Sequence, residues 1–245
     1  MTWVKICGMT NLEDALVAVD AGADAVGFVF YEKSPRYVTV ETAREIVGKL
    51  PESVEKVGVF VGPDEDPINA LRQARLTATQ CYISAEGIAG SNVRTKAMGM
   101  SLAPQRFRSL MAFPMSFFSG DVSQAERMVA GFVESRKKLP EAASIPDGVL
   151  DTFLLDSGNL RQPGGTGHTF DWKKARGLAA GMREAGLKLV VAGGLTPENV
   201  GEAIETLHPW GVDVVSGVEA SPGKKDPEKV RAFVRAVREM DRKVS

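Results

Sequence analysis

The chain has 245 residues, of which 44% are hydrophobic and 25% are charged, as in ordinary soluble globular proteins. Its 30 basic and 31 acidic residues leave a net charge of −1, which provides no electrostatic footprint for nucleic acid or for an anionic membrane. No apolar run is long enough to span a bilayer and the N-terminus carries no signal-peptide pattern, so we expect a cytoplasmic protein.

The cysteines and histidines are few and scattered. Cys7 and Cys81 lie far apart, as do the two histidines, so no metal-ligand cluster is formed by spacing. In a reducing compartment both cysteines would be free thiols. We expect neither a metal nor another cofactor.

Strand-like and helix-like segments alternate along the chain. The predicted strands are short and rich in valine: Trp3–Cys7, Ala25–Phe30, Val57–Val61, Thr79–Ile83, Met115–Ser119, Phe153–Asp156, Leu187–Ala192 and Val212–Ser216. The predicted helices are Leu12–Ala21, Val40–Leu50, Pro67–Ala74, Ala103–Met111, Gln124–Lys138, Trp172–Ala185, Pro197–Thr206 and Pro227–Met240. This alternation and the length predict an α/β fold, a single (β/α)8 TIM barrel over residues 1–245, with an open doubly wound sheet as the alternative.

The middle of the chain is the least regular part. Residues 84–102 carry Gly, Ala, Ser and Met with no clean period, which indicates an irregular insertion or a long loop. The fourth and fifth strands on either side of it are predicted only from short apolar runs.

The first strand places Cys7 at its C-terminal end, the end at which barrel enzymes carry their chemistry. In Trp3–Cys7, Lys5 shares one face with Cys7, and Val4 shares the other with Ile6. Taken alone, Cys7 is as well explained as a buried small hydrophobe.

The same parity makes a structural prediction for Lys5, which should point into the barrel. Strand eight closes against strand one, and Asp213 shares a face with Val215 there. A buried lysine without a partner is costly, so we predict a Lys5–Asp213 ion pair below the active site. Its positive end would lie near Cys7 and help to hold a thiolate.

Two glycine-bearing segments follow the last two strands, where barrels commonly bind phosphate. Gly193-Gly194 follows the seventh strand and Ser216-Gly217 follows the eighth. Either pair alone is explained by a tight turn, but both together favour a phosphate site made of backbone amides. A third segment, Pro163–Gly167, comes shortly after the sixth strand.

Two charged residues stand at the same end of the predicted barrel. Asp156 ends the apolar strand Phe153–Asp156, where an acid is costly unless it is paired or used. The turn residues that follow it also fit a helix cap. Arg36 lies in the loop after the second strand and is a candidate for binding a carboxylate.

The chain resembles the phosphoribosylanthranilate isomerase family, barrel enzymes of tryptophan biosynthesis. The matching stretches run in order: KICG at 5–8, GAD-VGF-F across 22–30, SPRYV at 34–38, LLDS at 154–157, PGGTG-TFDW across 163–172, AGGL-PENV across 192–200 and VD-SGVE-SPGKKD across 212–226. Each is weak alone, and the set is specific.

The resemblance implies an isomerase without a cofactor. Its substrate is a small phosphorylated sugar–anthranilate, N-(5-phosphoribosyl)anthranilate, which an Amadori rearrangement converts to 1-(2-carboxyphenylamino)-1-deoxyribulose 5-phosphate. Cys7 is implied as general base, Asp156 as general acid and Arg36 as the group that binds the anthranilate carboxylate. The implied phosphate site consists of Gly193, Gly194, Ser216 and Gly217. The implied mobile loop contains Gly164, Gly165, Thr166 and Gly167. Phe28 and Phe30 are candidates for contacting the anthranilate ring.

The chain also departs from the family. The Gln-Leu-His-Gly stretch usual after the fourth strand reads Gln80-Cys81-Tyr82-Ile83, residues 84–122 show no convincing match, and His168 replaces a usual basic residue. Two alternatives remain: another barrel sugar-phosphate isomerase or epimerase, and a non-catalytic barrel that binds a phosphorylated ligand. Histidine-pathway isomerases are expected to use two aspartates, and a pure binder would not need Cys7 with Asp156. The protein is expected to be a monomer or a homodimer.

Overall fold

The computed structural model describes residues 1–61, 66–82, 107–115, 122–137, 151–158 and 169–244. Eight parallel strands close into one barrel in chain order: β1 Trp3–Cys7, β2 Ala25–Val29, β3 Glu55–Phe60, β4 Ala78–Tyr82, β5 Arg108–Pro114, β6 Thr152–Asp156, β7 Lys188–Ala192 and β8 Gly211–Val214. The predicted barrel is therefore confirmed, and the open doubly wound sheet is wrong.

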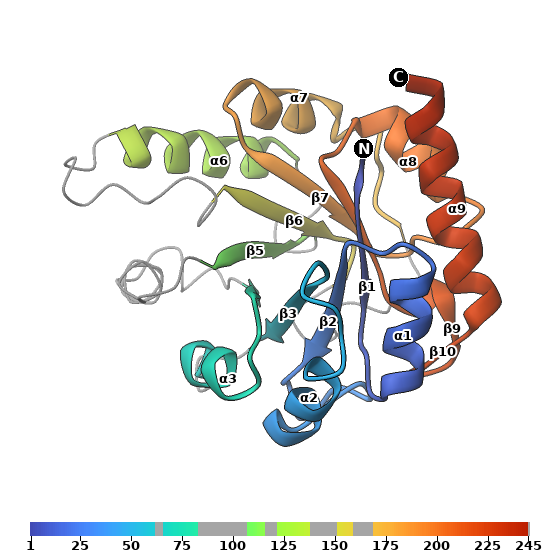
Figure 1. The fold of residues 1–245 in the computed structure, drawn as a ribbon. Coiled ribbons are helices and arrows are strands. Elements are labelled where there is room, and N and C mark those ends of the chain that lie inside the picture. The colour runs from blue at the N-terminus through green and yellow to red at the C-terminus, as the bar shows by residue number, and fades with distance from the viewer. Residues whose placement is uncertain (62–65, 83–106, 116–121, 138–150, 159–168, 245) are drawn as a thin grey trace.

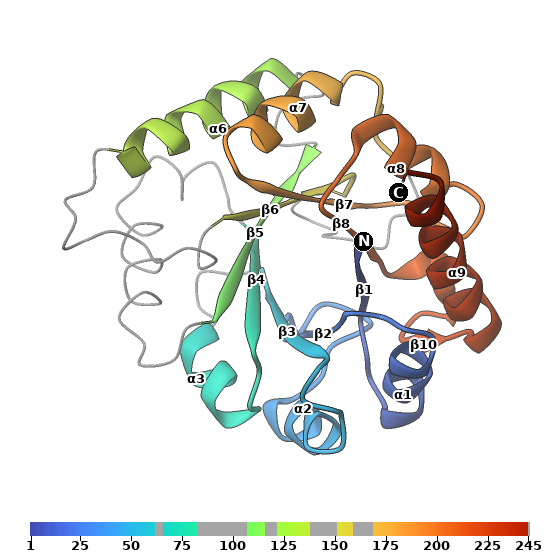
Figure 2. The ribbon, with the colours of Figure 1, turned by 45° about the horizontal axis from the view of Figure 1, so that its top comes forward.

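Helices surround the barrel (Figures 1 and 2). They are α1 Leu12–Asp20, α2 Val40–Val47, α3 Pro67–Gln73, α6 Val122–Lys137, α7 Arg176–Glu184, α8 Val200–Leu207 and α9 Pro227–Val244. After β8 come a short 3-10 turn, Ser216–Val218, and a two-stranded ribbon of β9 Glu219–Ser221 and β10 Lys224–Lys225. Of the described helices, none is long and apolar enough to cross a bilayer.

The fifth strand was predicted in the wrong place. The prediction set a helix at Ala103–Met111 and a strand at Met115–Ser119, whereas β5 runs from Arg108 to Pro114. Leu110–Phe113 is buried throughout, with alternate residues facing the barrel interior and the helices. An apolar run that is buried on both faces carries no period that distinguishes a strand from a buried helix. The predicted insertion at 84–102 lies outside the described residues.

The remaining strands lie within one or two residues of their predicted bounds. Their alternation divides the core into two layers. Val4 and Ile6 belong to the large cluster between barrel and helices, whereas Lys5 and Cys7 point inward, as the parity of β1 predicts. The barrel interior is filled by small and medium residues: Ala25, Val57, Ala78, Leu110, Ala112, Leu154, Val190 and Ala192.

Aromatic and charged side chains close the N-terminal end of the barrel. Trp3 and Trp210 stack with ring centroids 5.1 Å apart, and the Arg108 guanidinium lies 4.6 Å from the Trp210 centroid. Lys188 lies over the same ring at 5.3 Å and pairs with Asp151 at 2.8 Å. These side chains fill the N-terminal end of the barrel, so a pocket is expected at the opposite end, where the strands reach their C-terminal ends.

Candidate active site

A pocket of about 620 Å³, its open mouth included, lies at the C-terminal ends of the strands. Its lining brings together all the predicted site residues in the described part of the chain: Cys7, Arg36, Asp156, Gly193, Gly194, Ser216 and Gly217. The predicted mobile loop, Gly164, Gly165, Thr166 and Gly167, lies outside the described residues.

Cys7 ends β1 inside the barrel with 3% of its surface exposed. The neighbouring strand gives it room through a glycine: a Cβ on Gly27 would stand 2.6 Å from the Cys7 Sγ and 3.0 Å from Lys5 Cε. Burial raises the pKa of the Cys7 thiol, whereas the charge of Lys5 opposes that rise. Without substrate, Cys7 is therefore a thiol, with a cation beside it that favours the thiolate.

The predicted ion pair inside the barrel is confirmed. Lys5 lies opposite Asp213 in the β1–β8 register, and its Nζ donates to Asp213 Oδ1 at 3.0 Å, with both side chains buried. Burial alone would lower the pKa of Lys5, but the charge of Asp213, joined by that of Cys7 when Cys7 is ionised, outweighs it and leaves that pKa raised. Lys5 therefore carries a permanent positive charge beneath the pocket.

Asp156 ends β6 and is 2% exposed. Its Oδ2 accepts a hydrogen bond from the Tyr82 hydroxyl at 2.6 Å, and its Oδ1 accepts one from the Gly158 amide at 2.9 Å. Burial raises the pKa of the carboxyl, and these two bonds together with the Lys5 charge only partly oppose it. Such a carboxyl holds a proton more readily than an exposed aspartate, as a general acid requires.

Strand β4 supplies two pocket residues to which the sequence assigned no role. Gln80 and Tyr82 stand two positions apart and both line the pocket, so they share the inner face of the strand. Gln80 is 1% exposed, and its Oε1 has no hydrogen-bond partner among the described residues. The alternation of side chains along β4 could have identified Gln80 and Tyr82 as inner-face residues. It was not used because this stretch departs from the family pattern.

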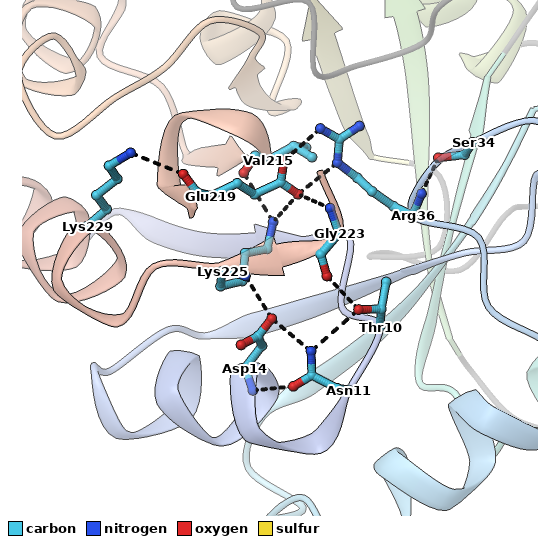
Figure 3. A network of polar contacts seen from close by, with 10 residues as sticks. All are labelled: Thr10, Asn11, Asp14, Ser34, Arg36, Val215, Glu219, Gly223, Lys225 and Lys229. Atoms are coloured by element: carbon cyan, nitrogen blue, oxygen red, sulfur yellow. Dashed lines mark hydrogen bonds and ion pairs between the residues drawn. The ribbon is translucent and has the colours of Figure 1, made fainter. Parts of the chain in front are cut away.

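Arg36 is held by a carboxylate of the protein itself. Its Nε donates to Glu219 Oε1 at 2.8 Å and its Nη2 donates to Glu219 Oε2 at 2.7 Å, a bidentate pair (Figure 3). Gly8, just after Cys7, leaves room for this arginine, because a Cβ there would stand 2.7 Å from Arg36 Cδ. Arg36 lines the pocket, and Nη1 is the guanidinium nitrogen that does not take part in the pair with Glu219.

Lys225 extends this pair into a buried network. Its Nζ donates to Glu219 Oε1 at 3.2 Å and to the Val215 carbonyl at 3.1 Å. Burial alone would raise the pKa of Glu219, but Arg36 and Lys225 leave it lowered, so Glu219 is ionised. The Lys225 amide donates to Asp14 Oδ2 at 2.7 Å, which ties the ribbon to α1 (Figure 3). Arg36 is therefore fixed in place before any ligand binds.

The two glycine segments are packed closely against their surroundings. Gly193 has a φ of +86° and Gly194 a φ of +62°, in the left-handed region that favours glycine. A Cβ on Gly193 would collide with Ser157, and one on Gly217 would collide with the Leu195 carbonyl. The turn geometry thus accounts for these glycines, and it also places both segments at the same wall of the pocket.

The two phenylalanines considered for the ligand's ring face the wrong way. Phe28 and Phe30 are buried in the cluster between barrel and helices, and Phe30 stacks on Phe60 with centroids 5.2 Å apart. Along β2 the inner face instead carries Gly27 and Val29. In the described ranges, no group of three His, Cys, Asp or Glu side chains is arranged to hold a metal ion.

Comparison with known proteins places the chain in a family. The family model for N-(5'-phosphoribosyl)anthranilate (PRA) isomerase matches residues 4–82 and 124–236, leaving out the stretch without resemblance. N-(5'-phosphoribosyl)anthranilate isomerases of Rubrobacter xylanophilus and Pelobacter propionicus are 44% and 41% identical, covering 97% and 98% of this chain and 100% and 97% of the relatives.

Solved structures give the same result. Phosphoribosyl anthranilate isomerase from Thermotoga maritima is 38% identical over 98% of this chain and 100% of its own, with a TM-score of 0.72. A second structure, of the enzyme in complex with reduced 1-(o-carboxyphenylamino)-1-deoxyribulose 5-phosphate, is also 38% identical, with the same coverage and a TM-score of 0.69. The barrel, its pocket and these matches over nearly the full length agree, and the chain belongs to the N-(5'-phosphoribosyl)anthranilate isomerase family.

Proposed function

We propose that the pocket catalyses the Amadori rearrangement of N-(5'-phosphoribosyl)anthranilate, with Cys7 as general base and Asp156 as general acid. The family supports the reaction. The observation that carries the residue roles is that a buried thiol from β1 and a buried carboxyl from β6 line one pocket, between two glycine segments and a fixed arginine.

The reaction requires one acid and one base. Asp156 gives its proton to the furanose ring oxygen as the bond from that oxygen to C1 breaks, and the nitrogen lone pair forms a C1=N iminium. The Cys7 thiolate then takes the proton from C2, and the electron pair moves through C1 to nitrogen, giving an enolamine that tautomerises to the ketone. An acid and a base on different sides of the sugar suit these two reaction steps.

The two charged ends of the substrate fix the sugar between these groups. The phosphate is assigned to Gly193, Gly194, Ser216 and Gly217, and the anthranilate carboxylate to the Nη1 side of Arg36, because Nε and Nη2 are bound to Glu219. Held geometry of this kind can supply several kcal/mol of barrier reduction. We expect the protein in the cytoplasm, where Cys7 and Cys81 remain free thiols, as a monomer or homodimer.

The direct test is an activity assay on the purified protein. N-(5'-phosphoribosyl)anthranilate is supplied, loss of its fluorescence is followed, and the product is identified by mass and by its keto group. Turnover without any added metal or redox cofactor is the expected result. Binding without turnover would instead support the non-catalytic barrel, and turnover only of other aminoaldose phosphates would support another isomerase of this fold.

The phosphate assignment predicts where an anion binds. In crystals soaked with inorganic phosphate, the ion is expected against the amides of Gly194, Ser216 and Gly217. Ser216→Asp should weaken product binding roughly 100-fold, because two like charges placed together cost several kcal/mol. Ser221→Asp makes the same charge change on an exposed part of β9 and should leave affinity unchanged. Phosphate bound only elsewhere, or equal losses for both variants, would contradict the assignment.

The carboxylate assignment makes a separate prediction for Arg36. Arg36→Met should weaken product binding about 10- to 100-fold by removing a charge-assisted hydrogen bond, while ribose 5-phosphate binding should change little. Calorimetry with both ligands gives the comparison. Arg44→Met, on the exposed face of α2, is the control. The change also leaves the Glu219 carboxylate with Lys225 and the Gly223 amide as its remaining partners among the described residues, so the double variant Arg36→Met/Glu219→Gln should show the same ligand preference. Equal losses for the two ligands would assign Arg36 to the fold.

A further inference from the structure

Tyr82 is the closest hydrogen-bonding neighbour of the proposed acid. It ends β4, and its hydroxyl lies 2.6 Å from Asp156 Oδ2, across the barrel interior from a strand that is not adjacent to its own. This distance is in the range of O–H···O⁻ bonds to an ionised carboxylate, about 2.5–2.7 Å. The Gly158 amide donates to the other oxygen, so both oxygens of Asp156 are fixed.

These two bonds decide where the proton of Asp156 resides. A backbone amide can only donate, so Oδ1 must remain an acceptor whether the carboxyl is neutral or ionised. The Tyr82 hydroxyl, unlike the amide, can either donate or accept, so Oδ2 is the oxygen that best accommodates the proton of the neutral acid. That oxygen keeps a lone pair, to which the Tyr82 hydroxyl can donate while the Oδ2 proton faces the pocket.

We propose that Tyr82 is a positioning residue for Asp156: its hydroxyl holds Oδ2 in place and stabilises the carboxylate that forms when the acid gives its proton to the substrate. The proposal rests on the acid role assigned above to Asp156. The bond is stronger to a carboxylate than to a neutral carboxyl, so it strengthens as the proton leaves. An interaction of that kind lowers the barrier more than it tightens substrate binding.

The surroundings keep the Tyr82 hydroxyl available as a donor. Burial, together with the charge of Asp156, raises the pKa of Tyr82 well above its ordinary value, so the phenol stays protonated at neutral pH. Among the described residues, the other ionisable groups near Asp156 are the Lys5–Asp213 pair, from β1 and β8, and Cys7 at the end of β1, which lines the same pocket. Tyr82→Phe leaves all three of these side chains in the sequence.

The test is a double-mutant cycle of Tyr82→Phe and Asp156→Asn, read as single-turnover rates at a pH below the pKa of Asp156, where the acid starts out neutral. Tyr82→Phe keeps the ring and its packing, and should slow the reaction about 10-fold with little change in KM, the effect of losing about 1.4 kcal/mol. In the Asp156→Asn background the same change should have almost no effect, because Tyr82 acts through Asp156. Tyr37→Phe, at a side chain 38% exposed, is the control that should keep the full rate.

A second readout needs no substrate. Carboxyl carbon NMR, with the Asp156 signal identified by its loss in Asp156→Asn, should show the pKa of Asp156 rising by about one unit in Tyr82→Phe. An unchanged pKa, or equal slowing by Tyr82→Phe with and without Asp156, would overturn the role of Tyr82 while leaving Asp156 as the acid. An Asp156→Asn variant with nearly full rate would overturn the acid role, and the Tyr82 proposal with it.

Discussion

Replacing Cys7 with alanine is expected to slow isomerisation by about 10²–10⁴-fold, the usual contribution of a general base. Cys7 is the proposed group that removes the C2 proton, and alanine cannot accept one. Alanine is smaller than cysteine and needs no more room than Cys7 already has beside Gly27, so the fold and the product affinity should be kept. Cys81→Ala is the matched control, because Cys81 packs against the layer between barrel and helices, away from the barrel interior.

The residual rate of the Cys7→Ala variant should also depend on pH in a defined direction. Its residual rate depends only on protonated Asp156, so it should fall as pH rises through the pKa of Asp156, which burial raises above the ordinary value for an aspartate. Rates measured from acid to neutral pH, with calorimetry for the product, test both parts. A Cys7→Ala variant that keeps most of its rate would remove Cys7 from the mechanism.

Lys5 links the confirmed ion pair to this chemistry. Its charge lowers the pKa of Cys7 and so opposes the effect of burial, although burial prevails in the substrate-free pocket. The role of Lys5 in holding the Cys7 thiolate therefore stays a prediction. It is supported by the position of Lys5, two residues before Cys7 on the same inner face of β1.

Residues whose placement depends on one strand could be predicted from the sequence. Parity within β1 places Lys5 and Cys7 inside the barrel, and closure of β8 against β1 then brings Asp213 to Lys5. The end of β6 likewise places Asp156 at the rim. Each of these inferences needs only the alternation of side chains and the order of strands.

Contacts that depend on several elements at once could not be predicted. The Tyr82–Asp156 bond requires the exact end of β4, in a stretch that differs from the family. The Arg36–Glu219 pair joins residues 183 positions apart through a ribbon that has no strong strand signal. Phe28 and Phe30 stood as candidates for the ligand's ring and lie instead between barrel and helices, because an apolar residue in a strand covered on both faces gives no sign of which face it occupies.

Asp156→Asn is expected to reduce the rate by about 10²–10⁴-fold, because an amide has no proton to give to the ring oxygen. Asparagine has nearly the same shape: its Oδ1 can still accept from the Gly158 amide, and its Nδ2 can donate to the Tyr82 hydroxyl, so product affinity should be kept. Calorimetry with the product and single-turnover rates measure the two effects. Asp151→Asn, at the opposite end of the barrel where that residue pairs with Lys188, is the control for the loss of a carboxylate.

The strongest test of the acid–base pair is how each variant responds to pH. An aspartate ordinarily titrates roughly 4 to 5 units below a thiol, and burial raises the pKa of both Asp156 and Cys7. The reactive form, neutral Asp156 with a Cys7 thiolate, has the same number of protons as the predominant form, carboxylate with thiol. The wild-type rate should therefore be level between the two pKa values, falling below the first and above the second.

Asp156→Asn should reverse the alkaline half of this profile. Its residual rate depends only on the thiolate, so it should rise with pH through the pKa of Cys7 and stay high, where the wild-type rate falls. Cys7→Ala should show the opposite trend. Two variants with the same pH dependence as the wild-type enzyme would mean that neither side chain moves a proton in the reaction, and the roles proposed for Cys7 and Asp156 would both be wrong.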